Sequence, residues 1–157
     1  MSGVIFKDQS IELFMGPRPG KKSFDRLAGL KLTHCCTLLS EREGAPLIKK
    51  IAARLDCEWV WLPIEGGHVD TLKQVDLHAC FAKLAMALAE TSAPRLYFHC
   101  SAGIHRTGFF VYALLRAMGL SEEAARARLA EIRLVTFEQV GEERLRLVEA
   151  LMAADKE

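Results

Sequence analysis

The chain has 157 residues, half of them apolar, and a formal net charge of +1 at pH 7. This length and apolar content predict a single domain over residues 1–157 with a buried core, and they exclude an intrinsically disordered chain. The near-neutral charge argues against nucleic acid or an anionic membrane as a partner, and no apolar run approaches the length of a membrane span.

Secondary structure follows from the apolar pattern, taken in chain order. Short apolar runs at Val4–Phe6 and Ile11–Met15 predict a β-hairpin around a polar turn. Further apolar runs predict strands at residues 32–39, 58–62 and 95–99. Helical periodicity and capping residues predict helices at residues 23–29, 47–55, 71–90, 107–118, 122–132 and 137–154. Ser121 is the expected N-cap of the fifth helix, and Thr136 with Gln139 forms a capping box for the last.

The alternation of strands and helices predicts an α/β fold, with a mostly parallel central sheet flanked by helices. Ligands of such sheets bind at the C-terminal ends of the strands. Cys100 follows one predicted strand, and residues 63–70 follow another. We therefore expect these two segments to meet at one rim and to form one site.

The cysteines indicate the compartment. There are five, an odd number without the paired spacing of a zinc site: Cys35, Cys36, Cys57, Cys80 and Cys100. The first residues show no charged leader followed by an apolar core, which a secretory signal would have. A reduced cytoplasmic protein is the expectation.

One segment between a predicted strand and a predicted helix carries most of the chemistry. It reads His99-Cys-Ser-Ala-Gly-Ile-His-Arg-Thr-Gly108. A loop of this length can turn successive backbone N–H groups inward, and the following helix adds its positive dipole end. Arg106 can grip two phosphate oxygens with its planar fork. The pattern predicts a cradle for a tetrahedral dianion beside a nucleophilic Cys100 thiolate. The substrate-binding positions are then Ser101, Ala102, Gly103, Ile104, His105 and Arg106.

These ten residues resemble the H-C-x-x-G-x-x-R-[ST]-G signature of the cysteine-dependent protein tyrosine phosphatases. The short chain is most similar to the dual-specificity branch, and Gly16–Gly20 with Leu62-Pro63-Ile64 matches its layout. The resemblance implies a phosphocysteine intermediate on Cys100, with no metal or cofactor. It also implies that the Thr107 hydroxyl donates to the sulfur and eases its departure. His99 is expected to be a buried residue that orders the loop.

The family also uses an acid to protonate the leaving oxygen, an Asp on the loop before the long helix. In this chain Glu65 stands at the most similar place, with one more methylene to position. Asp70 is the alternative acid, and its other role would be to cap the helix that begins at Thr71. His68 is a lesser candidate. The choice stays open at this point.

Two further questions stay open. Some relatives pair the nucleophile with a second cysteine, so Cys35 or Cys36 is a candidate for a reversible disulfide; two buried apolar side chains are the alternative. Relatives that act on phosphoinositides tend to carry Lys in the signature, where this chain has Ala102 and Ile104. We therefore expect phosphotyrosine or phosphoprotein substrates. The alternatives are a phosphatase of small phosphorylated molecules or phosphoinositides, and a catalytically weak phospho-binding module.

Overall fold

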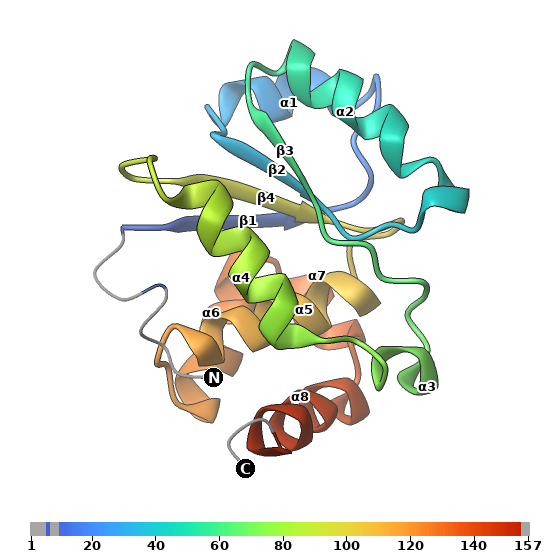
Figure 1. The fold of residues 1–157 in the computed structure, drawn as a ribbon, viewed down its shortest axis with the longest axis vertical. Coiled ribbons are helices and arrows are strands. Elements are labelled where there is room, and N and C mark those ends of the chain that lie inside the picture. Colours follow the sequence, from blue (N-terminus) through green and yellow to red (C-terminus); the bar gives the residue numbers. More distant parts are fainter. Residues whose placement is uncertain (1–5, 7–9, 155–157) are drawn as a thin grey trace.

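A computed structural model describes residue 6 and residues 10–154 (Figure 1). Its four strands form one sheet in the order β1-β4-β2-β3, and every neighbouring pair is parallel. The strands are β1 (Glu12–Gly16), β2 (His34–Thr37), β3 (Glu58–Trp61) and β4 (Arg95–His99). The predicted α/β fold with a parallel central sheet is therefore confirmed.

Helices cover both faces of this sheet. Their bounds are α1 (Phe24–Gly29), the 3₁₀ helix η2 (Glu41–Glu43), α2 (Ala45–Arg54), α3 (Val69–Leu72), α4 (Leu77–Leu88), α5 (His105–Ala117), α6 (Glu122–Ile132), α7 (Leu134–Gln139) and α8 (Glu142–Ala154). Figure 1 shows α1 and α2 on one face and α4 to α8 on the other. The central strands β2 and β4 are buried almost throughout, as a sheet covered on two faces requires.

The strands end level with one another at one rim of the sheet. In the strand register, His99 lies opposite both Gly16 and Thr37, and Thr37 lies opposite Trp61. Four connecting segments therefore leave the sheet side by side, after residues 16, 37, 61 and 99. This rim is where the predicted fold places a ligand.

Helix α5 follows the last of these segments and forms the centre of the core. Its side chains are buried from Arg106 to Leu115, and the ring of Phe110 lies against those of Phe81 and Phe98. An apolar helix that is enclosed on all sides is a rigid support for the loop before it. None of the helices in the described part of the chain is long and apolar enough to cross a membrane.

The predicted N-terminal hairpin can be compared with the structure at its second strand. This strand is present as β1, and it pairs in parallel with β4. The first predicted strand lies outside the described residues, except for Phe6, which is buried and meets the ring of Phe81 edge-on.

The predicted helix at residues 71–90 is two helices. The first ends at Leu72, and Asp76 starts the second as its N-cap, because its carboxylate accepts a hydrogen bond from the Ala79 amide at 3.0 Å. The residue at the N-cap position of the short α3 is His68, and Asp70 lies within its first turn. The expectation that Asp70 caps a long helix is therefore wrong.

The predicted helix at residues 137–154 is also two helices. Gly141 adopts a left-handed conformation, φ +91°, which separates α7 from α8. The predicted capping box of Thr136 with Gln139 does not exist, because Thr136 lies inside α7 and is fully buried. The strand at residues 95–99 and the helices at residues 107–118 and 122–132 were predicted within two residues of their observed bounds, and Ser121 caps α6 through its side chain as expected.

Candidate active site

The signature loop joins the end of β4 to the start of α5, and Cys100 lies at its base. This residue is only 4% exposed. The Thr107 hydroxyl donates a hydrogen bond to its sulfur at 3.0 Å. Strand, loop and helix thus place a sulfur and a hydroxyl donor together, in the arrangement that the sequence predicted.

All five carbonyl groups of residues 100–104 point out of the loop and accept hydrogen bonds. The donors are His99 Nδ1 to Cys100 O (3.1 Å), Arg18 N to Ser101 O (3.0 Å), Arg133 Nη1 to Ala102 O (3.3 Å), Thr136 Oγ1 to Gly103 O (2.7 Å) and Gly108 N to Ile104 O (2.8 Å). In a trans peptide the carbonyl and the next amide point in opposite directions, and no peptide here is cis. The amides of residues 101–105 therefore face the interior of the loop, which is an anion nest.

Gly103 has a conformation and a position that exclude other residues. Its φ is +74°, and an added Cβ would lie 2.2 Å from the carbonyl oxygen of Gly16. Its own carbonyl accepts from two side chains of the α7 segment, Thr136 and Arg133 Nη1 (3.0 Å). These two hydrogen bonds fix the peptide between Gly103 and Ile104, and the Ile104 amide of this peptide faces the nest. This contact was not predicted, because Thr136 was expected to form a capping box with Gln139.

Arg106 is buried and is held by Glu43 from the 3₁₀ helix η2. Its Nη1 and Nη2 atoms donate to the two carboxylate oxygens at 2.7 and 2.8 Å, and Nη1 also donates to Ile64 O at 3.0 Å. A guanidinium has five N–H donors, so Nε–H and one Nη2–H remain. These two share one edge of the plane, which is the edge that can grip a phosphoryl group with two hydrogen bonds.

Glu43 is a site residue that was not predicted from the sequence. Its carboxylate also accepts from the Ser40 amide at 2.9 Å and the Ser40 hydroxyl at 2.8 Å. The hydrogen bonds from Arg106 are the main reason that the pKa of Glu43 falls to about 2, and those from Ser40 add to the effect. The same pair raises the pKa of Arg106, and the nearby Cys100 side chain contributes. The only sequence signal was the Ser40-x-x-Glu43 spacing, which is typical of a local capping box.

His99 is a structural residue, as expected. Its Nδ1 must carry the proton, because its partner is the Cys100 carbonyl, which can only accept. Its Nε2 then accepts from the Thr37 hydroxyl at 2.8 Å, and that hydroxyl accepts in turn from Trp59 Nε1. Burial lowers the pKa of His99 to about 4, so the ring is neutral at physiological pH. The neutral His99 ring orders the base of the loop through its two hydrogen bonds.

The loop between β3 and α3, residues 62–68, contacts the signature loop at two points on either side of Glu65. Ile64 O accepts from Arg106, and a Cβ added at Gly67 would lie 2.9 Å from the Cβ of His105. The Glu65 side chain itself is 65% exposed and lies 3.4 Å from Arg42 Nη2. The structure thus brings the segment that carries Glu65 beside Arg106 and His105.

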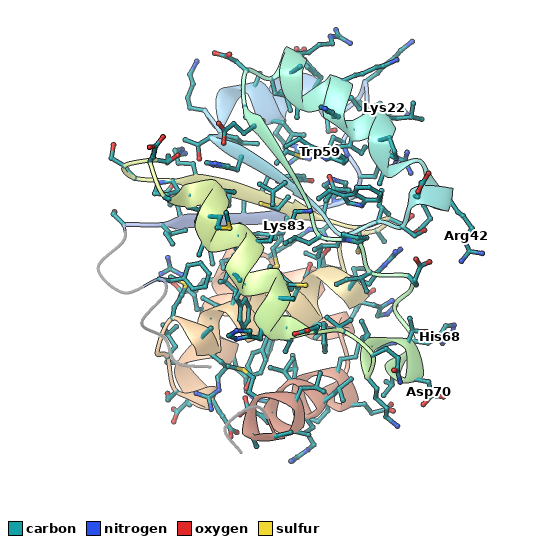
Figure 2. All side chains as sticks on the ribbon, viewed as in Figure 1. Lys22, Arg42, Trp59, His68, Asp70 and Lys83 are labelled. Atoms are coloured by element: carbon teal, nitrogen blue, oxygen red, sulfur yellow. The ribbon has the colours of Figure 1, made fainter. Side chains whose placement is uncertain are left out.

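The alternative acid, Asp70, lies beyond these contacts. Its side chain is 96% exposed on α3 and pairs with Lys73 at 3.4 Å. Figure 2 shows Asp70 and His68 at the outer side of α3. A carboxylate in water beside a lysine lacks the contacts to the signature loop that the segment around Glu65 has.

Cys35 and Cys36 both lie in β2, next to β4 as expected, and both are fully buried. The register places them opposite Tyr97 and Phe98, before the level of Cys100. Burial raises the pKa of Cys35 to about 12 and also raises that of Cys36, so both are thiols at neutral pH. These surroundings support the packing role, and all five cysteines are free.

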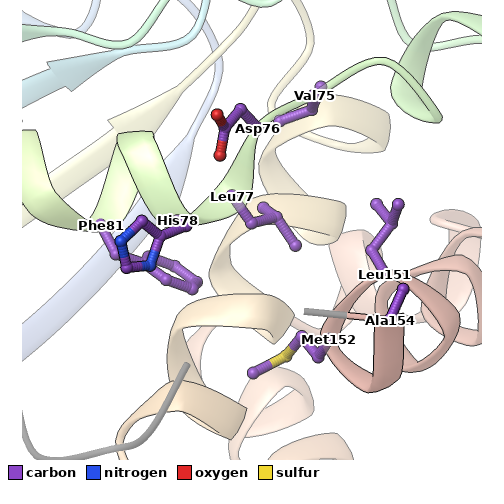
Figure 3. A pocket seen from close by; sticks show the side chains of 8 residues that line it. All are labelled: Val75, Asp76, Leu77, His78, Phe81, Leu151, Met152 and Ala154. Atoms are coloured by element: carbon purple, nitrogen blue, oxygen red, sulfur yellow. The ribbon is translucent and has the colours of Figure 1, made fainter. Parts of the chain in front are cut away.

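A cavity of about 290 Å³ lies between the start of α4 and the end of α8 (Figure 3). It is lined by Val75, Asp76, Leu77, His78, Phe81, Leu151, Met152 and Ala154. None of these residues belongs to the signature loop or to residues 62–68, so this cavity is separate from the candidate active site. Among residues 6 and 10–154, no group of three or more His, Cys, Asp or Glu side chains could hold a metal ion.

A buried cysteine, an inward ring of amides and a guanidinium with one free edge, all at the rim of a parallel sheet, define a thiol-based phosphatase site. The family model described as "Tyrosine phosphatase family" matches residues 19–128, more than half of the chain. The chain belongs to this family of cysteine-dependent phosphatases. No curated protein matches it significantly.

Solved structures of small phosphatases share the fold. Tk-PTP in its active form is 19% identical over 93% of each chain, with a TM-score of 0.66. PTP-2 of Cydia pomonella is 16% identical over 88% of this chain and 84% of its own, with a TM-score of 0.64. PTPMT1 is 21% identical over 93% of this chain and 96% of its own, with a TM-score of 0.57. At such identities these likenesses establish the fold alone.

Proposed function

We propose that the protein hydrolyses phosphate monoesters of phosphotyrosine or other phosphoprotein residues through a phosphocysteine on Cys100. The observation that carries this proposal is the free Nε–Nη2 edge of Arg106 beside a nest of inward amides and the Cys100 sulfur. Such preorganised donors stabilise the charge of a transferring phosphoryl group without reorganising during the reaction.

The proposed reaction has two steps. The Cys100 thiolate attacks phosphorus and the ester P–O bond breaks, while the carboxylic acid of Glu65 gives its proton to the leaving oxygen. Water then attacks the phosphocysteine, the Glu65 carboxylate takes a proton from that water, and the P–S bond breaks. The Thr107 hydroxyl, 3.0 Å from the sulfur, stabilises the thiolate that departs. Inorganic phosphate and the original thiolate are the products.

Glu65 is the better supported acid. The carbonyl of Ile64, the residue before it, is bonded to Arg106, so the backbone that carries Glu65 lies beside the signature loop. Asp70 has no described contact of this kind. On a substrate with a poor leaving group, Glu65→Gln should lower kcat by about 10²-fold and Asp70→Asn should change it little.

Phosphorylated small molecules, phosphoinositides included, are the second candidate substrates. The solved complex of PTPMT1 with PI(5)P shows that a protein of this fold binds such a headgroup. The Arg133 guanidinium bonds to the carbonyls of Ala102 and Gly103 from outside the signature loop, so positive charge lies next to a loop that contains Ala102 and Ile104 in place of lysine. A phospho-binding module is the third candidate, because the exposed Glu65 is not yet turned towards the nest.

The test is a substrate panel with the wild-type protein and Cys100→Ser. Phosphotyrosine peptides, phosphoserine peptides, phosphoinositide headgroups and nucleotides are compared by kcat/KM. We expect phosphotyrosine peptides to be turned over fastest and Cys100→Ser to be inactive while still binding inorganic phosphate. Binding without turnover by the wild type would favour the phospho-binding module, and substantial turnover by Cys100→Ser would exclude the phosphocysteine mechanism.

A further inference from the structure

The break between α7 and α8 has a consequence for residues 62–68, the acid loop. Arg144 lies in the first turn of α8, and its Nε donates to Gly67 O at 2.8 Å. Its Nη1 donates to Val140 O, at the end of α7, at 2.9 Å. One guanidinium therefore ties the acid loop to the turn between the two helices. An unbroken helix through Gly141 would leave the Val140 carbonyl engaged within the helix and would direct α8 elsewhere.

Leu62 and Ile64 hold the start of the acid loop in the core, whereas no side chain from Glu65 to His68 is buried. One wall of a cleft of about 450 Å³ is formed by residues 61–65, and the opposite wall by α3, α4 and the residues between them. On that side the loop faces a space rather than packed side chains. On its inner side, Ile64 O accepts from Arg106. The hydrogen bonds at Ile64 and Gly67 therefore bracket Glu65, one on each side.

We propose that Arg144 is a positioning residue for the proton transfer: it holds the acid loop against the signature loop so that Glu65 reaches the leaving oxygen. This inference rests on the proposed function and adds a residue from a distant helix to it. Gly67 lies against His105, which is where loop and signature loop touch, and the Arg144 bond fixes the Gly67 carbonyl at that contact. Displacement of a catalytic group by about 1 Å can cost on the order of 10²-fold in rate.

Arginine suits this position because its planar fork bonds to two carbonyls at once, whereas the single ammonium of lysine has no fixed fork. Arg146, two residues along the same helix, is a matched control. Its side chain is 78% exposed and its ion pair is with Glu142 of its own helix. Arg146→Gln thus removes an α8 arginine without touching the acid loop.

The first experiment compares phenyl phosphate, a poor leaving group, with p-nitrophenyl phosphate, a good one that scarcely needs an acid. Arg144→Gln should lower kcat for phenyl phosphate by about 10- to 100-fold and for p-nitrophenyl phosphate by less than about threefold. Inhibition by inorganic phosphate should not change. Arg144→Lys should recover part of the loss, and Arg146→Gln should behave as wild type. If Arg144→Gln does not fold, Arg144→Lys carries the same comparison.

The second experiment repeats the substitution in a Glu65→Gln background. If Arg144 acts through Glu65, the double variant should be no slower on phenyl phosphate than Glu65→Gln alone. Equal losses on both substrates, a further loss in the double variant, or no effect of Glu65→Gln by itself would overturn the proposal. Absence of all activity from the wild type would instead contradict the proposed function, so the two failures are distinguishable.

Discussion

The signature loop and the acid loop meet at one rim but are held in place to very different degrees. In the signature loop, all five carbonyls of residues 100–104 are bonded to the surrounding scaffold, and the support behind it is the buried helix α5. In the acid loop, Leu62 and Ile64 are buried, but no side chain from Glu65 to His68 is, and hydrogen bonds to the carbonyls of Ile64 and Gly67 fix this part beside a cleft. Anion binding is therefore built into the core of the fold, whereas proton delivery depends on a few polar contacts from neighbouring elements.

The largest effect is expected from Arg106→Lys. A lysine cannot hold Glu43 and grip a phosphoryl group with two parallel hydrogen bonds at once. We expect kcat/KM to fall by roughly 10³-fold on phenyl phosphate and p-nitrophenyl phosphate alike. A loss of equal size on both substrates would show that Arg106 binds the phosphoryl group itself. Steady-state kinetics on the two substrates measures it. A loss confined to phenyl phosphate would mean that Arg106 acts through the acid loop.

Glu43→Gln tests whether the ion pair between Glu43 and Arg106 stabilises the fold. The quantity compared is the pH dependence of the free energy of unfolding. The pKa of Glu43 is about 2 in the folded protein against an ordinary 4.5, so the folded state favours the carboxylate. The stabilisation is complete above pH 4.5 and is lost as the pH falls towards 2. We expect the free energy of unfolding of the wild type to fall by about 1 to 3 kcal/mol over this range because of Glu43.

In Glu43→Gln this part of the pH dependence should be absent. Urea unfolding at several pH values between 2 and 6 gives the comparison. Glu41→Gln, on the same 3₁₀ helix, is the control, since Glu41 is exposed. Identical pH dependences for wild type and Glu43→Gln would show that the ion pair with Arg106 contributes nothing to folding.

Thr136→Val is expected to have a moderate effect. It keeps the shape of the side chain but removes the 2.7 Å hydrogen bond to Gly103 O. A carbonyl that is less firmly held outward leaves the opposing Ile104 amide less firmly held inward, so phosphate affinity should fall by about tenfold. Calorimetric titration with phosphate measures the change. Thr136→Ser restores the donor and should bind phosphate as wild type does; failure of that rescue would assign the effect to packing.

The smallest effect is expected from Asp70→Asn. Asp70 is 96% exposed and pairs with exposed Lys73, an interaction worth little in water. We expect less than about a twofold change in kcat and a change in unfolding free energy within about 0.5 kcal/mol. A large loss confined to phenyl phosphate would reverse the assignment and make Asp70 the acid.

The sequence predicted the parts of the site that are local in the chain. Cys100, Arg106 and Thr107 lie within eight residues, and a strand before them and a helix after them were visible in the apolar pattern. The parallel sheet then implied that the loop after β3 would lie at the same rim. These predictions rested on periodicity and on short-range spacing, both of which a sequence displays directly.

The supporting residues could not be predicted in this way. Glu43, Thr136 and Arg144 bond to partners that are 63, 33 and 77 residues away in the chain. Thr136 and Glu43 each fitted a capping box, a local pattern that was sufficient to explain them. The helix breaks at Asp76 and Gly141 were missed because the apolar stripes continue across them. Tertiary contacts decide the structure at these positions, and one sequence does not show which distant residues come into contact.

The central claim is that Cys100 carries the phosphoryl group during turnover. Rapid acid quenching of the wild type with a phosphotyrosine peptide, followed by mass spectrometry of the fragment that contains Cys100, tests it most directly. The account predicts a fragment heavier by one phosphoryl group in the wild type, which is absent in Cys100→Ser. Turnover by the wild type with no modified Cys100 at any quench time would contradict it.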